Sequence, residues 1–464
     1  MPQAADGSHT SDLVVLGGGS GGYAAAFRAA ELGLSVTLIE KDKLGGTCLH
    51  RGCIPTKALL HAAEIADSAR DGAKFGVRST LESIDMPGVH SYKDKVVGGL
   101  YKGVQGLFKQ HKINVVAAAG RLVSPTAVEA DGVTYEGRHI LLATGSVPRT
   151  LPGLQLDGER IITSDDALIL DRVPESVVIL GGGVIGVEFA SLWRSFGAEV
   201  TIVEALPRLL PTEDASSSKL LERAFRRRGI TAHTGVRFAG VTRTENGVVV
   251  SLEDGTAIDA ELLLVAVGRG PVSEGLGYEQ AGVTLDRGFV VVDDYYQSSV
   301  PTISAVGDLI PTLQLAHAGF GEGILVAERL AGVAVSPIDY AGVPRITYSE
   351  PEVASVGYTE EQAAQKYGAD GIESFVLNLA GIGKAQILGT SGATKVIRKK
   401  DGPVIGIHIV GTRAGELLAE GQLIYNWEAY PEDVAPLIHP HPTLSEAIGE
   451  AHLALAGKPL HVHP

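Results

Sequence analysis

One pattern of residues occurs twice in this chain and constrains its fold more than any other feature. Each copy is an apolar run, a glycine-rich turn, an apolar helical stretch and a second apolar run that ends at a glutamate. Gly17 corresponds to Gly181 and Glu40 to Glu204, so the offset is 164 residues. Short apolar runs beside glycines are typical of buried strands. Each copy therefore predicts a strand–helix–strand unit, and the repeat predicts an α/β chain with two similar domains.

The glycines of each turn have the spacing GxGxxG, a fingerprint of dinucleotide binding when it follows a strand and opens a helix. The first glycine makes the turn, the second lets a pyrophosphate approach the backbone, and the third lets the helix pack on the strand. The free N–H groups at the start of the helix favour the phosphate charge. Two Rossmann-like dinucleotide-binding domains are expected. The six glycines are Gly17, Gly19, Gly22, Gly181, Gly183 and Gly186.

The glutamate that ends each copy, Glu40 or Glu204, is suited to accept hydrogen bonds from ribose hydroxyls. Because Glu204 would repel a 2′-phosphate, the second site is expected to prefer NAD to NADP. Arg208 is close in sequence to Glu204, but a single arginine on a surface loop is expected to be solvated. The first site, which is joined to a cysteine segment, is the better candidate for FAD.

Composition excludes several classes of function. The chain has 464 residues, of which 39 are Lys or Arg and 54 are Asp or Glu, and its net charge is −15. This charge argues against a nucleic-acid or anionic-membrane surface. The sequence has no apolar run long enough to span a bilayer and no secretory signal at its start. Two cysteines are too few for a disulfide scaffold, so we expect a cytoplasmic protein.

Both cysteines, Cys48 and Cys53, lie in the segment GGTCLHRGCIPTK (45–57). A helix is expected to begin around them, and a helix N-terminus lowers the pKa of a thiol. A lone cysteine is usually a small buried hydrophobe, but a pair between glycines indicates a site. Two cysteines and His50 make a poor metal site without further ligands at suitable spacing, so a redox disulfide is favoured and no metal is expected.

This segment and the two fingerprints resemble the flavoprotein disulfide reductases, and the resemblance covers essentially the whole chain. It implies FAD, a nicotinamide cofactor and a CxxxxC disulfide. It also implies that Cys53 is the charge-transfer partner of the flavin and that Cys48 is the interchange thiol. Lys57 would lie near flavin N5 and pair with Glu188 of the second fingerprint.

Two further segments carry the same resemblance. LLATGS (141–146) is similar to the family's ATG segment at the exit of the first FAD-binding half. This similarity implies that Thr144 and Gly145 belong to the FAD site. AVGD (305–308) is similar to the second FAD motif, in which Asp308 would hold a ribityl hydroxyl.

Departures from the family pattern occur at three places, one of which is LAHAGFGEG (315–323), where the commoner family spelling is LAHKAEDEG. GRGPV (268–272) has Val272 where the family commonly has Asn, and the resemblance implies that Arg269 lies near the nicotinamide nucleotide. His50 and Arg51 stand between the cysteines in place of the commoner Asn-Val. His50 could tune a thiol pKa, although a local hydrogen-bonding role is favoured.

The segment HPHPTLSEAIGEAH (439–452) leads from a loop into a helix. Thr443 and Glu446 fit a capping box at the start of that helix. The segment also resembles the HxHPTxSE signature of the dihydrolipoyl dehydrogenases. This resemblance implies that His441 is the catalytic base and that Glu446 fixes its tautomer. The bond before Pro442 is a candidate cis peptide.

In that family the histidine segment reaches the disulfide of the other subunit, which implies a homodimer with a shared active site. His439 would be a neighbour in the pocket. The remaining C-terminal histidines match no motif and are expected at the surface: His452, His461 and His463.

The number of cysteines argues against several other members of this group of reductases, because both cysteines of the chain lie in one motif. A mercuric reductase and a large thioredoxin reductase each need a further C-terminal cysteine pair, and a coenzyme A disulfide reductase would lack one of these two. An NADPH-dependent reductase of a low-molecular-weight disulfide, of mycothiol or glutathione type, remains the alternative enzyme. A role as a dimeric docking subunit alone would need neither the cysteines nor the fingerprints.

The sequence therefore predicts an FAD-dependent disulfide oxidoreductase that oxidises dihydrolipoamide with NAD⁺. Its partners would be lipoyl domains of 2-oxoacid dehydrogenase or glycine cleavage complexes. Four domains are expected, the last an α+β interface domain for dimerisation: residues 1–147 for FAD and the redox disulfide, 148–271 for NAD, 272–342 as a central domain that completes the FAD site, and 343–464 for the interface.

Overall fold

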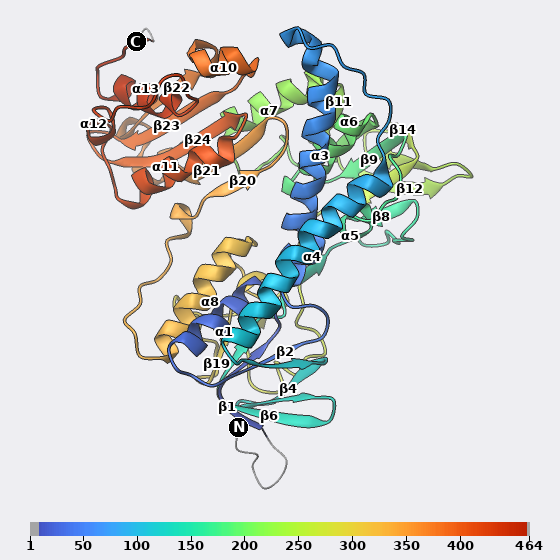
Figure 1. Ribbon diagram of the computed structural model, residues 1–464, viewed down its shortest axis with the longest axis vertical. Coiled ribbons are helices and arrows are strands. Elements are labelled where there is room, and N and C mark those ends of the chain that lie inside the picture. The colour runs from blue at the N-terminus through green and yellow to red at the C-terminus, as the bar shows by residue number, and fades with distance from the viewer. Residues whose placement is uncertain (1–8, 462–464) are drawn as a thin grey trace. The chain divides into compact units, whose positions relative to one another are not determined.

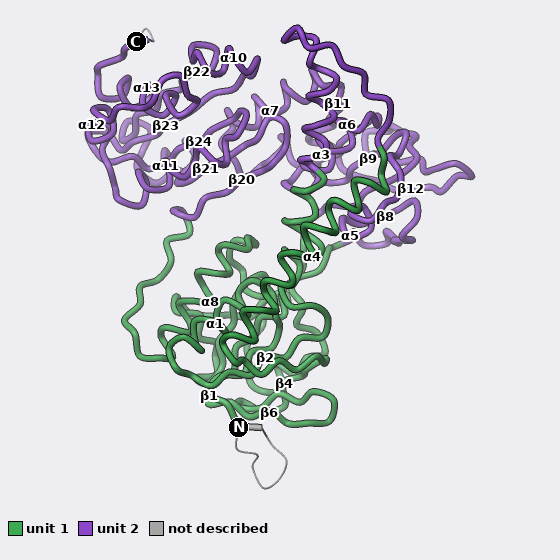
Figure 2. Tube along the Cα trace, in the orientation of Figure 1, with its two compact units in different colours: residues 1–59, 85–149, 268–340 green, residues 60–84, 150–267, 341–464 purple. Residues whose placement is uncertain are grey.

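The structure is a computed structural model that describes residues 9–461 (Figure 1). The chain forms two compact units, coloured separately in Figure 2. Unit 1 contains residues 9–59, 85–149 and 268–340, and unit 2 contains residues 60–84, 150–267 and 341–461. The expected four-domain division stays a prediction. Within residues 9–461, none of the helices combines the length and apolar character needed to cross a membrane.

Unit 1 is built around one mostly parallel sheet with the strand order β3-β2-β1-β6-β5-β4, and β19 also pairs with β6. The first predicted strand–helix–strand unit is present as β1, α1 and β2. Its elements, with α3 continuing into unit 2, are β1 His9–Leu16, α1 Ser20–Glu31, β2 Val36–Glu40, α2 Gly46–Arg51, α3 Cys53–Asp71, α4 Met86–Gln110, β3 Asn114–Ala117, β4 Gly120–Ser124, β5 Ala127–Ala130, β6 Val133–Leu142, β7 Ser146–Pro148, β16 Arg269–Pro271, β17 Leu285–Asp286, β18 Phe289–Val290, β19 Ile303–Ala305 and α8 Ala316–Leu330.

Unit 2 contains a parallel sheet ordered β11-β10-β9-β15-β8, a small antiparallel sheet of β12 to β14, and an antiparallel sheet ordered β20-β21-β24-β23-β22. The second predicted unit is present as β9, α6 and β10. The elements are β8 Ile161–Thr163, α5 Ser164–Ala167, β9 Ser176–Leu180, α6 Val184–Phe196, β10 Glu199–Glu204, α7 Ala215–Arg227, β11 Ile230–Thr234, β12 Phe238–Arg243, β13 Val248–Leu252, β14 Ala257–Ala260, β15 Leu262–Val265, β20 Arg345–Thr347, β21 Glu352–Gly357, α9 Glu360–Tyr367, β22 Ile372–Asn378, α10 Gly383–Leu388, β23 Ala393–Lys399, β24 Val404–Gly411, α11 Ala414–Asn426, α12 Pro431–Val434 and α13 Glu446–Leu455.

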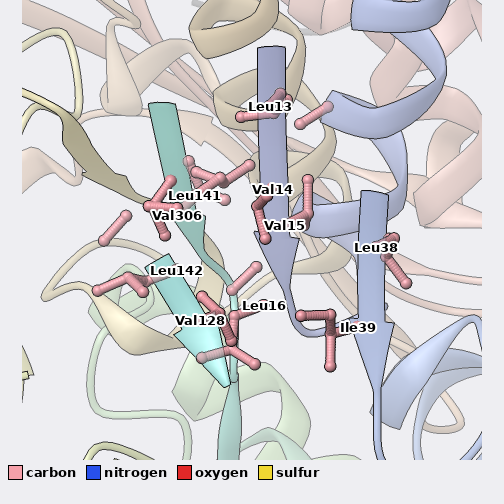
Figure 3. Packing of buried hydrophobic residues seen from close by; sticks show 14 of the residues in the cluster. Leu13, Val14, Val15, Leu16, Leu38, Ile39, Val128, Leu141, Leu142 and Val306 are labelled. Atoms are coloured by element: carbon pink, nitrogen blue, oxygen red, sulfur yellow. The ribbon is translucent and has the colours of Figure 1, made fainter. Parts of the chain in front are cut away.

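The apolar run that predicted β1 is buried on both faces of the sheet. Leu13, Val14 and Val15 are fully buried, and Figure 3 shows them between side chains of the neighbouring strands. Val15 pairs in register with Leu38 of β2 and with Leu141 of β6. A continuous apolar run is what a parallel strand covered on both faces requires. The first glycine turn therefore follows directly on a strand that is fixed in the core.

Helices α1 and α8 of unit 1 approach each other closely because glycines lie between them. A Cβ atom on Gly323 would lie 2.2 Å from the carbonyl oxygen of Gly21 and 3.0 Å from the amide nitrogen of Ala25. A Cβ atom on Gly21 would in turn lie 3.2 Å from the carbonyl oxygen of Gly319. Part of the glycine content of the chain is thus a packing requirement between two helices.

Helix α4 forms in a polar stretch of the chain that is rich in glycine. A Cβ atom on Gly98, Gly99, Gly103 or Gly106 would meet no atom within 4 Å, so these glycines serve no packing purpose. Glycine costs about 1 kcal/mol relative to alanine in a helix. Burial of Phe108, which is 3 % exposed, is one of the tertiary contacts that offset this cost.

Alanine substitution should therefore have opposite effects at two helical glycines. We expect Gly323→Ala to lower the free energy of unfolding by about 1–3 kcal/mol, because the added carbon meets backbone atoms that cannot move freely. The matched change Gly103→Ala, on the exposed face of α4, should raise it by about 0.5–1 kcal/mol. Urea unfolding at one protein concentration measures both. Equal effects would contradict the proposed close packing of α1 on α8.

Candidate active site

The first glycine turn has the geometry that a bound dinucleotide requires. Gly17 has a φ of +107°, and a Cβ atom there would lie 2.2 Å from the carbonyl oxygen of Ala143. A Cβ atom on Gly22 would lie 2.0 Å from the carbonyl oxygen of Gly17. A Cβ atom on Gly19, by contrast, would meet nothing within 4 Å. Gly17 and Gly22 are thus needed for packing, whereas Gly19 leaves open space for a ligand to approach the backbone.

The second turn repeats these features in unit 2. Gly181 has a φ of +113°, and a Cβ atom there would lie 2.3 Å from the carbonyl oxygen of Ala266. A Cβ atom on Gly186 would lie 1.9 Å from the carbonyl oxygen of Gly181, and one on Gly183 would meet nothing within 4 Å. Both turns therefore fit a pyrophosphate at the start of a helix.

Each turn is tied to the glutamate that ends the following strand. Glu40 accepts hydrogen bonds from the backbone N–H groups of Gly18 at 2.7 Å and Asp42 at 2.8 Å. Glu204 accepts the equivalent bonds from Gly182 at 2.6 Å and Leu206 at 2.7 Å. Both carboxylates are thus held in place by backbone N–H groups, as acceptors that a ribose could use.

Arg208 contacts its own loop and a glutamate of α9. Its Nη2 donates to the carbonyl oxygen of Pro211 at 3.1 Å and lies 3.8 Å from Glu361. We expected this arginine to be solvated. Its side chain is instead held by a hydrogen bond within its own loop and is 31 % exposed.

The cysteine segment packs directly on the first glycine turn. Cys48 lies in α2, and Cys53 is the first residue of α3. A Cβ atom on Gly46 would lie 2.6 Å from the Cα of Gly19, and Gly45 donates to the carbonyl oxygen of Gly18 at 2.8 Å. The glycines before Cys48 therefore let the thiol segment contact the turn that is open to a ligand.

The two thiols are electrostatically linked. A hydrogen bond with Cys53, burial, and the negative charge on Cys53 raise the pKa of Cys48, and the Lys57 ammonium opposes this shift. Burial and the charges on both cysteines raise the pKa of Tyr23 in α1 to about 12. Cys48 therefore loses its proton less readily than an isolated thiol does. His50 takes a local role: its Nε2 lies 2.9 Å from the carbonyl oxygen of Leu44, and its ring packs edge-on against Tyr101.

The predicted FAD residues of the ATG segment meet the GRGPV segment within unit 1. Thr144 donates to the carbonyl oxygen of Val272 at 2.6 Å and lies 2.9 Å from the hydroxyl of Tyr278. The N–H group of Val272 donates to Gly145 at 2.9 Å. Position 272 therefore acts here through its backbone, which a valine supplies as well as an asparagine does.

A buried carboxylate that the motifs do not reveal supports the second FAD motif. Glu322 in α8 is fully buried and accepts hydrogen bonds from the N–H of Gly307 at 2.6 Å, from Thr312 at 2.9 Å and from Tyr340 at 2.7 Å. Burial raises the pKa of Tyr296, which bonds to Tyr340, to about 12, so this hydroxyl stays protonated. The only sign of Glu322 in the sequence is a glutamate on an otherwise apolar helix face.

His441 and Glu446 are paired in unit 2. His441 Nδ1 lies 2.8 Å from Glu446 Oε1, and Glu446 Oε2 accepts from the N–H of Thr443 at 2.9 Å. Burial alone would raise the pKa of Glu446, but the bonds from Thr443 and His441 outweigh it and lower that pKa. The carboxylate is therefore ionised at neutral pH and accepts the Nδ1 proton, which leaves His441 Nε2 as an acceptor.

The start of α13 differs from the predicted capping box. The helix begins at Glu446 with Ser445 at its N-cap, and Thr443 Oγ1 donates to the carbonyl oxygen of Pro440 at 2.7 Å. The reverse half of the box is present, because Glu446 reaches back to the Thr443 N–H. The peptide bond before Pro442 is cis, as expected.

The expectation that His452 lies at the surface is wrong. His452 is fully buried, and its Nδ1 lies 2.7 Å from the carbonyl oxygen of Ile448, one turn earlier on the buried face of α13. His439 lies nearby and bonds to Glu420 at 2.8 Å, and a Cβ atom on Gly449 would lie 2.6 Å from its ring. His461 is exposed, and His463 lies outside the described residues.

Other predicted residues are placed in separate units. Lys57 is half-buried in unit 1, and Glu188 is buried in unit 2, where it accepts a hydrogen bond from the N–H of Tyr348 at 2.9 Å. Their pairing stays a prediction. Arg269 lies in unit 1, 3.9 Å from Asp308.

In residues 9–461, His, Cys, Asp and Glu form no cluster of three that could hold a metal ion.

Comparison with known proteins identifies the family. Residues 11–323 match the pyridine nucleotide-disulphide oxidoreductase family, and residues 343–452 match the dimerisation domain of that family. The chain belongs to the pyridine nucleotide-disulphide oxidoreductase family. This membership confirms the fold class and the family that the motifs predict.

Relatives within the family cover nearly the whole chain. A dihydrolipoyl dehydrogenase of Bacillus subtilis is 41 % identical over 97 % of this chain and 99 % of its own length. A mitochondrial dihydrolipoyl dehydrogenase of Pisum sativum is 39 % identical over 99 % of this chain and 94 % of its own length. The crystal structure of LpdA from Mycobacterium tuberculosis has a TM-score of 0.89 and 30 % identity, over 96 % of this chain and 99 % of that one.

Burial of His452 should make the stability of this family member depend on pH. Burial lowers the pKa of His452 from 6.5 to about 4, so below pH 6.5 the unfolded chain takes up a proton that the folded chain refuses. Stability is therefore lost as the pH falls from 6.5 toward about 4. Between pH 7.5 and 5.5 we expect His452 to contribute a loss of about 1.4 kcal/mol.

Urea unfolding of the FAD-loaded protein at both pH values measures this loss. His452→Leu should show a smaller pH dependence than the unmodified protein by that amount, whereas the matched change at the exposed His61, His61→Gln, should leave the dependence as it is. An unchanged slope in His452→Leu would show that the histidine titrates alike in both states.

Proposed function

We propose that this chain is a dihydrolipoyl dehydrogenase, which oxidises protein-bound dihydrolipoamide to lipoamide with FAD as bound cofactor and NAD⁺ as acceptor. The observation that carries the proposal is the packing of the cysteine segment on the first dinucleotide turn, where Gly46 meets Gly19. A thiol pair fixed to such a turn is suited to exchange electrons with a bound dinucleotide, and a docking protein needs no such arrangement. Full-length relatives named dihydrolipoyl dehydrogenase support the same activity.

The residues present fit both cofactors. The open positions at Gly19 and Gly183 suit the two pyrophosphates, and Glu40 and Glu204 offer fixed acceptors to the two riboses. Thr144, Gly145, Asp308 and Lys57 would complete the FAD site. FAD and NAD supply the electron and hydride transfer, while the protein supplies binding, orientation and protonation. Because Glu204 repels a 2′-phosphate, NAD is favoured over NADP.

The cysteine pair carries out the exchange with substrate. In the oxidised enzyme, a thiolate of dihydrolipoamide attacks Cys48, a substrate–Cys48 bond forms, and Cys53 leaves as the thiolate. The second substrate thiol then attacks the mixed disulfide, lipoamide leaves, and Cys48 becomes a thiol. Two electrons now reside on the pair, and its one thiolate is on Cys53. The raised pKa of Cys48 supports this distribution.

His441 is the base of this exchange. The Glu446 carboxylate can only accept, so it fixes the Nδ1–H tautomer and leaves Nε2 to take protons from the substrate thiols. The His441 side chain is 76 % exposed, as a group that meets substrate or a second subunit should be.

The match of residues 343–452 to a dimerisation domain supports a homodimer. In this homodimer the His441–Glu446 pair of one chain serves the Cys48–Cys53 pair of the other. The dithiol is presented by lipoyl domains of a 2-oxoacid dehydrogenase or glycine cleavage complex. The cytoplasmic location stays a prediction that rests on cysteine usage.

Steady-state rates with lipoamide test the activity and the choice of nucleotide together. We expect turnover with NADH and little with NADPH. Glu204→Ala should raise the KM for NADH roughly 10- to 100-fold, since two hydrogen bonds to a charged acceptor are lost. Turnover with NADPH and a mycothiol- or glutathione-type disulfide, but none with NADH and lipoamide, would establish the alternative reductase instead.

Variants at the two halves of the site test the mechanism. Cys48→Ser should abolish lipoamide turnover while the protein stays yellow with bound FAD. His441→Ala should lower kcat/KM for dihydrolipoamide by about 10²- to 10⁴-fold yet still allow NADH to bleach the flavin absorbance. His61→Ala, at an exposed histidine outside the motif, is the control. A fully active His441→Ala enzyme would refute the assignment of the base.

A further inference from the structure

A chain of hydrogen bonds joins three segments of unit 1 that are far apart in sequence. Ser146 of β7 donates through Oγ to Asp308 Oδ2 at 2.5 Å. Arg269 of β16 donates through Nε to Ser146 Oγ at 2.8 Å and through Nη2 to the Ser146 carbonyl oxygen at 2.8 Å. The Arg269 Nε also lies 3.9 Å from Asp308 Oδ2. One serine thus links an arginine to the aspartate of the second FAD motif.

The direction of these bonds follows from the groups themselves. A guanidinium has donors only, so Ser146 Oγ must accept from Arg269. A hydroxyl has one proton, and Arg269 has no acceptor for it, so that proton points at Asp308. Arg269 therefore orients the Ser146 hydroxyl, and the hydroxyl in turn fixes one oxygen of the Asp308 carboxylate.

The surroundings hold this arrangement rigid. Ser146 is 6 % exposed, and the Arg269 side chain is 13 % exposed, so water competes little for these bonds. Strands β7 and β16 are antiparallel neighbours, with Ser146 opposite Pro271. On the other side, Glu322 fixes the N–H of Gly307, the residue before Asp308. The carboxylate is thus oriented from its side chain and from its backbone.

We propose that Ser146 and Arg269 are positioning residues of the flavin site, which act by orienting Asp308 toward the FAD ribityl chain. This proposal rests on the proposed function for the role of Asp308 as a flavin-site residue. It assigns Arg269 to the flavin, whereas the GRGPV motif had suggested the nicotinamide nucleotide. The bonds of Arg269 to Ser146, beside Asp308, carry the argument, because they use two of the donor nitrogens of its guanidinium.

FAD release and nicotinamide binding separate the two roles of Arg269. In the holoenzyme, Ser146→Ala and Arg269→Lys should each speed the release of FAD in mild urea at least about 10-fold, followed by the rise of flavin fluorescence. The KM for NADH should stay within about 2-fold of the unmodified enzyme. Ser146→Thr, which keeps the hydroxyl, should release FAD more slowly than Ser146→Ala.

Ser304→Ala is the matched control, because buried Ser304 accepts a comparable hydrogen bond from Arg329 at 2.7 Å in the same unit. It should leave FAD release within about 2-fold. The proposal is overturned if FAD release is unchanged and the KM for NADH rises, if Ser304→Ala has the same effect as Ser146→Ala, or if apo and FAD-loaded Ser146→Ala lose equal thermal stability.

Failure of the proposed function would be seen separately. Lipoamide turnover and FAD content of the unmodified protein decide that function, whereas the ratio of FAD release between variant and unmodified protein decides the role of Ser146 and Arg269. An unmodified protein that holds FAD but does not turn over lipoamide would leave this ratio measurable.

Discussion

Contact between backbone atoms at the two glycine turns is the constraint on which the rest of the structure depends. Gly22 lies against the carbonyl oxygen of Gly17, and Gly186 lies against that of Gly181, at distances that exclude any side chain. Each helix is thereby fixed with its free N–H groups at the carboxyl end of a buried strand. The cysteine segment then packs on the first of these turns through Gly46. Without this close approach, neither the ligand-facing backbone nor the thiol pair would have a defined position.

Carboxylates bound to backbone N–H groups recur at the two glycine turns, at the second FAD motif and in the histidine segment. Glu40 and Glu204 bind the glycine turns, Glu322 binds Gly307, and Glu446 binds Thr443. A carboxylate has two oxygens and about four acceptor sites, so one side chain can fix a loop and still face another group. The protein uses this capacity to combine local order with chemistry, which limits the entropy lost when a ligand binds.

Features that depend on local sequence patterns could be predicted, whereas features that depend on contacts between distant residues could not. The two strand–helix–strand units follow from apolar runs and glycine spacing, which act over a few residues. The hydrogen bonds of Ser146 could not be foreseen, because its partners Arg269 and Asp308 are 123 and 162 residues away. The burial of His452 depends on the face of α13 that meets the core, and helix α4 forms although its glycines disfavour a helix.

The two interpretations of Glu446, as a helix-capping residue and as the partner of a catalytic histidine, describe the same carboxylate. Its Oε2 accepts from the N–H of Thr443, which precedes α13, and its Oε1 binds His441. Helix α13 is fixed in the core, because its residues Ala447 and Ile448 are fully buried. Glu446 belongs to this helix and therefore fixes the orientation of His441. A histidine that is 76 % exposed can in this way keep one tautomer and one direction, because the residue that orients it belongs to the core-packed helix and not to the exposed loop.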